Sequence, residues 1–111
     1  MRINIDDADY DENYTYTYEG EPFTGELIET APDGTVVASI PVVEGIPNGL
    51  QRAWYFNGSL QRETSVVDGR AVGQSRSWHQ NGRLAEEQEF DERGRQVSVR
   101  RWAEDGSALT G

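Results

Sequence analysis

Glycines at a fixed spacing are the feature of this sequence that most constrains its fold. Gly34, Gly58, Gly82 and Gly106 follow one another at intervals of 24 residues. The three tryptophans keep the same interval, and an aliphatic residue stands two places after each glycine. Those residues are Trp54, Trp78 and Trp102, and Val36, Leu60, Leu84 and Ala108. A period of this length, held by three kinds of residue, is typical of repeat proteins. We therefore expect one small unit to be copied along the chain.

The spaced glycines follow Asn or Asp, and such dipeptides are typical of β-hairpin turns. Pro32-Asp33-Gly34 indicates which kind of turn is present. Proline fits the first position of a type I turn, and glycine takes the positive φ that follows. This predicts a three-residue loop with a glycine bulge. In that register Trp54 lies opposite Leu60, Trp78 opposite Leu84, and Trp102 opposite Ala108.

The segments between the turns are short and rich in Val, Tyr, Phe, Trp and Thr, as strands are. Nothing in the sequence shows the apolar spacing of a helix. We predict an all-β fold, a single-layer antiparallel meander of repeated hairpins that is twisted or partly curled. It forms one domain over residues 1–111, with an acidic N-terminal segment at 1–12 and hairpins over 13–110, linked by Gly-x-x-x-Gly segments. The predicted strands are 13–19, 24–30, 35–43, 49–56, 59–67, 73–79, 83–90, 96–103 and 107–110.

Alternation along these strands predicts two unlike faces. One face is aromatic and apolar, and it also carries three arginines spaced by 24 residues. Its predicted members are Tyr14, Tyr16, Tyr18, Ile28, Val36, Ile40, Val42, Leu50, Trp54, Leu60, Val66, Trp78, Leu84, Phe90 and Trp102, with Arg52, Arg76 and Arg100. The other face is more polar and includes Ser39, Glu63, His79, Glu87 and Glu89. We expect the tryptophans to form a ladder of rings under the arginine stems. One sheet cannot cover its own apolar face, so the remaining strip indicates an interaction site.

The net charge of −10 is confined to the first two-fifths of the chain. Residues 1–44 contain eleven acidic residues and one arginine, whereas residues 45–111 contain nine of each. Such an end would attract a basic partner and repel nucleic acid and anionic lipid, unless the acidic tail serves only for solubility. The chain has no cysteine, no apolar run long enough to span a membrane and no signal-peptide core. We expect a cytoplasmic protein that binds neither nucleic acid nor membrane.

Residues suited to catalysis are sparse. His79 is the only histidine, so neither a zinc site nor any other cofactor is predicted. A Ser-His-Asp arrangement with Ser75 or Ser77 stays open, but no nucleophile elbow surrounds them, and a solvated histidine is the favoured interpretation. Glu63 and Glu87 recur at one repeat position, which indicates a structural ladder with the arginines rather than an acid–base pair. Whether the protein is an enzyme stays open.

Two stretches resemble the MORN-repeat variant found in bacterial proteins. They are Trp54-Tyr-Phe-Asn-Gly-Ser-Leu60 and Ser77-Trp-His-Gln-Asn-Gly-Arg-Leu84, with Gly45–Gly49 and Gly69–Gly73 beside them. The resemblance covers residues 20 to 110 and implies a hairpin repeat without catalytic residues. Small bacterial proteins of this kind are commonly labelled antitoxins or immunity-like proteins, so the resemblance implies protein binding. Eukaryotic MORN proteins are linked to phospholipids, which the charge of this chain would repel.

Two functions therefore stay open. The first is a non-catalytic protein-binding module, antitoxin- or immunity-like, that neutralises a basic partner through an acidic end and an aromatic face. Its predicted binding residues are Trp54, Tyr55, Trp78, His79, Trp102, Arg52, Arg76, Arg100, Tyr14, Tyr16, Tyr18, Asp6, Asp7, Asp9 and Asp11. The alternative is a small-molecule binding protein or biosynthetic enzyme with a pocket lined by tryptophan and arginine, where His79 or Glu63 would be the acid or base. A homodimer is compatible with either function.

Overall fold

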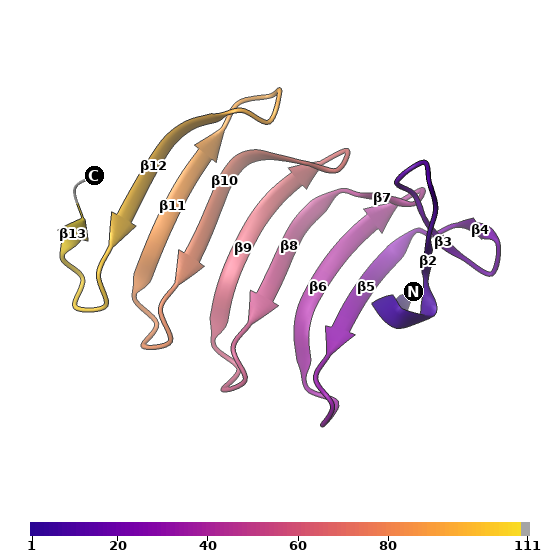
Figure 1. Ribbon diagram of the computed structural model, residues 1–111, viewed down its shortest axis with the longest axis horizontal. Coiled ribbons are helices and arrows are strands. Elements are labelled where there is room, and N and C mark those ends of the chain that lie inside the picture. The colour runs from indigo at the N-terminus through magenta and orange to yellow at the C-terminus, as the bar shows by residue number, and fades with distance from the viewer. Residues whose placement is uncertain (110–111) are drawn as a thin grey trace.

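The computed structural model describes residues 1–109 and shows an all-β protein built on one large open sheet (Figure 1). Along β5, β6, β8, β9, β10, β11, β12 and β13 each strand runs antiparallel to its neighbour, as a series of hairpins, and the short β7 also pairs with β6. The strands are β5 (Gly25–Thr30), β6 (Val36–Val43), β7 (Ile46–Pro47), β8 (Gly49–Trp54), β9 (Leu60–Val67), β10 (Arg70–Trp78), β11 (Leu84–Phe90), β12 (Gln96–Trp102) and β13 (Ala108–Leu109). The sheet neither closes nor curls, and the molecule measures 49 × 37 × 19 Å. The last residue of the predicted strand 107–110 lies outside the described residues.

The hairpin turns have the predicted geometry. Between β8 and β9, the N–H of Tyr55 donates to the carbonyl of Ser59 at 2.9 Å, and the N–H of Gly58 donates to the carbonyl of Tyr55 at 2.9 Å. Gly58 has a φ of 88°, and the ladder shifts by one residue next to the Trp54–Leu60 pair. The other two predicted pairs, Trp78–Leu84 and Trp102–Ala108, are also present. The loop type and its register are therefore confirmed.

The connections at the other end of the sheet are also tight turns. Glu44 and Gly45 link β6 to β7 with φ values of 49° and 83°, and Asp68 and Gly69 link β9 to β10 with 51° and 82°. Two successive residues with positive φ are typical of a type I′ turn, whose twist matches that of the flanking strands. The first glycine of each Gly-x-x-x-Gly segment therefore completes a turn.

The N-terminal region differs from the prediction. The edge beside β5 is taken by β1 (Arg2–Asn4), which runs parallel to β5, so the large sheet is mixed. The segment 13–19 was predicted to begin the meander, and this was wrong. Its strand β3 (Tyr16–Tyr18) belongs to a second sheet with β2 (Asp9–Tyr10) and β4 (Glu21–Pro22), which follows the short 3₁₀ helix η1 (Ile5–Asp7). The alternating Tyr-Thr pattern specifies a strand but not its partner.

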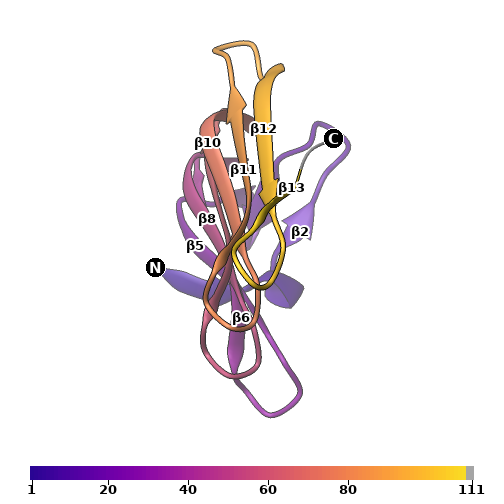
Figure 2. The same ribbon diagram turned by 90° about the vertical axis from the view of Figure 1, so that its left-hand side faces the viewer.

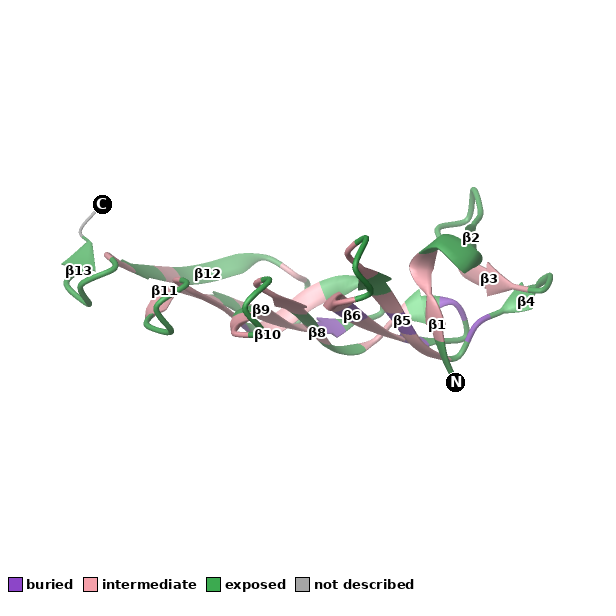
Figure 3. Cartoon of the chain, turned by 90° about the horizontal axis from the view of Figure 1, so that it is seen from below, coloured by how far each residue is buried: buried purple, intermediate pink, exposed green. Residues whose placement is uncertain are grey.

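The core is small and lies at the N-terminal end of the large sheet (Figure 3). Phe23, Leu27 and Val42 are 3%, 0% and 1% exposed. The partly buried residues packed on them are Ile3, Ile5, Ala8, Tyr16, Tyr18 and Ile40. The small sheet and η1 therefore cover one face of β5 and β6, and this burial of apolar area is what draws the N-terminal region onto the sheet. We call this side of the large sheet the Leu27 face. Within residues 1–109, no helix is long and apolar enough to cross a membrane.

The opposite side, which we call the tryptophan face, carries Trp54, Trp78 and Trp102 with the three predicted arginines. Several side chains were assigned to the wrong face. Ser39 and Glu63 pair directly with Arg52 across the strands, and Glu87 pairs with Arg76, so these polar residues lie on the tryptophan face. Glu89 is two residues after Glu87 on β11 and therefore also lies on the tryptophan face. The residues that lie on the Leu27 face are Ile40, Val42, Val66 and Phe90. The bulge after each glycine turn inserts one extra residue into the strand. The prediction continued the alternation of faces through this residue, so it placed the side chains beyond the bulge on the wrong face.

Candidate functional site

One row of side chains on the tryptophan face is aromatic and aliphatic. It consists of the cross-strand pairs Thr30–Val36, Trp54–Leu60, Trp78–Leu84 and Trp102–Ala108. The three tryptophans are half-buried. Figure 3 shows that no second layer of the described chain lies over β8, β10 and β12, which carry them. The row therefore offers aromatic surface along the length of the sheet.

A second row on the same face alternates in charge. The Nε–H of Arg52 donates to Oε2 of Glu63 at 2.8 Å, and that of Arg76 donates to Oε2 of Glu87 at 2.9 Å. Glu63 is also the cross-strand neighbour of Arg76, and Glu87 that of Arg100. The predicted ladder of arginine and glutamate is confirmed. Part-exposed pairs of this kind contribute about 0.5 kcal/mol each, so the ladder fixes the register more than it adds stability.

Tyr55 and His79 hold neighbouring turns together. The hydroxyl of Tyr55 donates to the carbonyl of Trp78 at 2.7 Å. Nε2 of His79 lies 2.8 Å from the carbonyl oxygen of Trp102, which can only accept, so this nitrogen carries the proton. Both side chains are half-buried. The interpretation of His79 as a solvated histidine did not include this backbone hydrogen bond. The hydroxyl of Ser75 is bonded to that of Thr64 at 2.8 Å, on the Leu27 side, so that serine is committed elsewhere.

The predicted acidic residues lie away from the tryptophan face. Asp6 and Asp7 are in η1 and Asp9 is in β2, and all three are exposed. Asp11 has a structural role, because its Oδ1 accepts the N–H groups of Asn13 and Thr15 at 2.9 Å. Figure 2 shows β2 and its neighbours standing apart from the plane of the large sheet. The structure thus divides the predicted binding residues between two surfaces.

The tyrosines belong to the acidic part of the molecule and not to the tryptophan face. Tyr14 and Tyr16 line one pocket together with Tyr10, whereas Tyr18 lines a separate hollow. Burial raises the pKa of the Tyr16 hydroxyl, and the nearby Tyr10 adds to this effect. The sequence predicted that these tyrosines accompany the acidic end, whereas their predicted shared face with the tryptophans was wrong.

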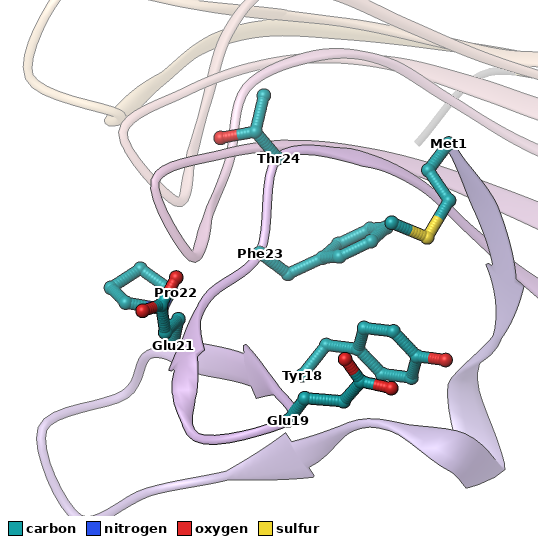
Figure 4. Close-up of a pocket in the computed structure, with 7 residues that line it drawn as sticks. All are labelled: Met1, Tyr18, Glu19, Glu21, Pro22, Phe23 and Thr24. Atoms are coloured by element: carbon teal, nitrogen blue, oxygen red, sulfur yellow. The ribbon is translucent and has the colours of Figure 1, made fainter.

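Two hollows are candidates for small molecules. The one that holds Tyr18 has a volume of about 440 Å³, and Figure 4 shows Phe23 reaching across it toward Met1. Its charged lining residues are Glu19 and Glu21. The hollow that reaches a tryptophan, about 280 Å³, is lined by Arg2, Val36, Trp54 and Gly58. Neither contains Arg52, Arg76 or Arg100, which the small-molecule alternative requires.

No three His, Cys, Asp or Glu side chains gather in a group that could hold a metal ion anywhere in residues 1–109. Comparison of the chain with protein-family models, with curated proteins and with solved structures found no match. The surfaces of the chain are therefore the basis for inferring a function.

Carboxylates that close turns predict how the fold responds to acid. The N–H of Thr35 donates to Oδ1 of Asp33 at 2.9 Å and lowers the pKa of that carboxyl. The pKa values of Asp91 and Asp105 are lowered in the same way, by the N–H of Arg95 and the hydroxyl of Ser107. A folded-state pKa below the ordinary value of 3.8 means that the fold favours the charged form. That stability is fully present above this value and is lost as the pH falls through the lower folded pKa. We expect the urea midpoint to fall as the pH drops below about 4.

A variant separates this effect from general acid unfolding. Asparagine keeps an oxygen that accepts the turn N–H but does not titrate. The triple variant Asp33→Asn, Asp91→Asn, Asp105→Asn should therefore lose less stability between neutral and acidic pH than the parent chain. Equal losses in the two proteins, measured by urea denaturation at each pH, would contradict the assignment.

Proposed function

We propose that this chain is a non-catalytic protein-binding module, antitoxin- or immunity-like, that neutralises a basic protein partner. The observation that carries the proposal is the uncovered row of half-buried Trp54, Trp78 and Trp102 on one face of an open sheet. Aromatic side chains at the centre of such a surface are the usual anchors of protein interfaces. Partly exposed apolar side chains that follow one another along a sheet face are typical of interaction sites.

We further infer that the large sheet is an array of MORN-like hairpin units, each 24 residues long. The equal spacing of the turn glycines and of the tryptophans in the sequence supports this. In such an array equivalent side chains stand in straight rows, so the binding surface grows in length with the number of units. An elongated partner segment suits a surface of this shape.

Charge complementarity indicates a basic partner. The net charge of −10 comes entirely from residues 1–44, and Asp6, Asp7 and Asp9 are exposed. Charges are largely screened beyond about 10 Å at 0.1 M salt, and the molecule is 19 Å across its shortest dimension. The acidic segment therefore acts on a partner that approaches the N-terminal end of the sheet, and it acts over a longer range at low salt. The acidic segment would steer the encounter and the tryptophan row would anchor the complex.

The small-molecule alternative receives less support. Arg52 and Arg76 are already paired with Glu63 and Glu87, so an anionic ligand would have to displace a carboxylate. A protein partner needs no such displacement, because it can cover the ladder and keep its pairs. We therefore retain protein binding as the function of the tryptophan face.

Association with the product of the adjacent gene tests the proposal. We expect a stable complex on co-purification, and Trp78→Ala should raise its dissociation rate constant by about 30-fold, as loss of an interface anchor does. Trp54→Ala repeats the test at a second position. Val97→Ala, which shortens an exposed side chain on β12 outside the row, is the matched control and should leave the rate unchanged.

The rate of association tests whether the acidic segment steers the partner. Replacing Asp6, Asp7 and Asp9 with asparagine should slow association at low salt and have little effect at high salt, because screening removes the long-range attraction. Thermal denaturation checks that every variant is folded. Failure to form a complex, or dissociation that is indifferent to both tryptophans, would refute protein binding through this face.

A further inference from the structure

A second pocket of about 440 Å³ lies between the small sheet and the turns of the large sheet. Three tyrosines, Tyr10, Tyr14 and Tyr16, line it from the small sheet and its loop. Ile46 and Pro47 of β7 and Asp68 of the β9–β10 turn line it from the large sheet. Residues far apart in the sequence thus bring several aromatic rings and one carboxylate to a single opening.

The rings are inclined to one another and do not form a closed stack. The ring centroids of Tyr10 and Tyr16 are 4.6 Å apart with planes at 52°, and those of Tyr10 and Tyr14 are 6.3 Å apart with planes at 63°. Tyr10 and Tyr14 are 55% and 74% exposed. Much of this aromatic surface is therefore open to a ligand.

Backbone hydrogen bonds hold the two walls in place. The N–H of Tyr16 donates to the carbonyl of Gly45 at 2.8 Å, which ties the small sheet to the β6–β7 turn. The N–H of Gly69 donates to the carbonyl of Pro47 at 2.9 Å, which ties the β9–β10 turn to β7. The pocket is therefore formed before any ligand arrives, and this lowers the entropy cost of binding.

The backbone of Tyr14 is the observation that points to a ligand. The turn 11–15 has the hydrogen bonds of the glycine turns, from the N–H of Asp11 to the carbonyl of Thr15 at 3.0 Å and from the N–H of Tyr14 to the carbonyl of Asp11 at 3.1 Å. The β8–β9 turn has Gly58 at the equivalent position, with a φ of 88°, whereas the turn 11–15 has Tyr14 there, with a φ of 61°. A bulky residue is disfavoured in the left-handed region, and a ring that is 74% exposed regains little by burial. Stability does not explain the choice of tyrosine, whereas its place in the pocket does.

We propose that this pocket binds the guanidinium or ammonium group of a basic side chain, an assignment that rests on the proposed function because it gives the basic partner a docking point. Tyrosine ring faces attract organic cations, and Asp68 supplies a carboxylate that can accept their N–H groups. The net charge of −10 on residues 1–44 would also attract a cation. Aromatic faces and a carboxylate at one opening select a cation over a neutral group.

The test uses the full-length chain labelled with ¹⁵N and the probe N-acetyl-arginine amide, followed by NMR. We expect saturable shifts of the amide signals of Tyr10, Tyr14, Asp68 and Gly69. The neutral isostere N-acetyl-citrulline amide should bind at least about tenfold more weakly, because it lacks the charge that the rings and the carboxylate recognise.

Two variants and one control make the assignment specific. Tyr14→Gly should weaken binding of the probe by about threefold to tenfold. Because glycine relieves the backbone strain, its thermal midpoint should stay within about 3 °C of the parent value or rise. Asp68→Asn should also weaken binding, and asparagine tolerates the positive φ of 51° at that position. Phe56→Ala removes a 78% exposed ring from another turn tip and should change nothing.

Several results would overturn the assignment. These are equal binding of the citrulline analogue, shifts that map elsewhere, or unaltered binding by Tyr14→Gly. Tighter binding of tetramethylammonium than of the arginine probe would also overturn it, because the pocket would then select a quaternary ammonium. The probe reports on the pocket without the partner. If the arginine probe does not bind but a complex with the protein partner forms and depends on Trp78, the pocket assignment alone is refuted. If the probe binds but no complex with a protein partner forms, the proposed function alone is refuted.

Discussion

Leu27→Ala should lower the free energy of unfolding by about 3 to 4 kcal/mol, within the usual range for a buried leucine. Leu27 is completely buried, and within residues 1–109 Phe23 and Val42 join it in the core cluster of buried residues. Partly buried side chains of the N-terminal region pack around this cluster, so the deleted side-chain atoms leave an internal cavity. Urea denaturation followed by tryptophan fluorescence measures the change.

Leu50→Ala is the matched control for this prediction. It makes the same chemical change in the same large sheet, at a residue that is 44% exposed. We expect a loss below about 1 kcal/mol there, because little apolar area leaves water at this position. Similar losses at the two positions would show that the cluster around Leu27 is not the main source of stability.

Gly45→Ala should cost about 3 kcal/mol, the sum of a left-handed backbone penalty and overpacking. Gly45 has a φ of 83°, and a Cβ built there would collide with the side chain of Thr15 and the carbonyl of Tyr16. Since Tyr16 also donates to the Gly45 carbonyl, the small sheet must shift away from the large one. Hydrogen exchange should show faster exchange of the Tyr16 amide.

Gly58→Ala separates the backbone effect from the steric one. Gly58 has a similar φ of 88°, but a Cβ there would meet nothing within 4 Å. We expect a cost of about 1 kcal/mol, which reflects the backbone alone. If the two substitutions were equally costly, the close approach of the small sheet to Gly45 would have no energetic weight.

The elements governed by local chemistry could be predicted from the sequence. Pro32-Asp33-Gly34 specifies a turn type by the φ values that proline and glycine allow, and the turn type fixes the Trp54–Leu60 pair. No distant contact is needed for either step. The arginine–glutamate ladder was likewise predictable, because equal spacing of unlike charges places them on neighbouring strands.

The errors arose where a distant contact or a small irregularity decides the structure. Tyr16 and Tyr18 fold over Leu27 because the sheet must cover its apolar side, and no pattern within 13–19 reveals this. The side on which Glu63 lies depends on the bulge beside Leu60, and counting by twos through a bulge gives the opposite face. The predicted loop type already implied that bulge, so this second error was avoidable.

The tyrosine-lined pocket that we propose to bind a cation was only partly predictable from the sequence. Tyr14 and Tyr16 were predicted as binding residues, but Tyr10 and Asp68 were not. Asp68 comes close to the tyrosines only because two turns are tied together by the Gly69–Pro47 hydrogen bond. One local signal was available, since Asn13-Tyr14-Thr15 matches Asp33-Gly34-Thr35 with tyrosine in the glycine position.

The one-sided position of the core sets the order in which the molecule assembles and comes apart. Phe23, Leu27, Val42 and Val66 are the buried apolar residues of the described chain, and they precede β10. Each later hairpin pairs with the strand that precedes it in the sheet. During synthesis the part that contains the core leaves the ribosome first, and we expect the later hairpins to add to its edge strand in turn. Loss of structure runs the other way, from the last hairpin inward.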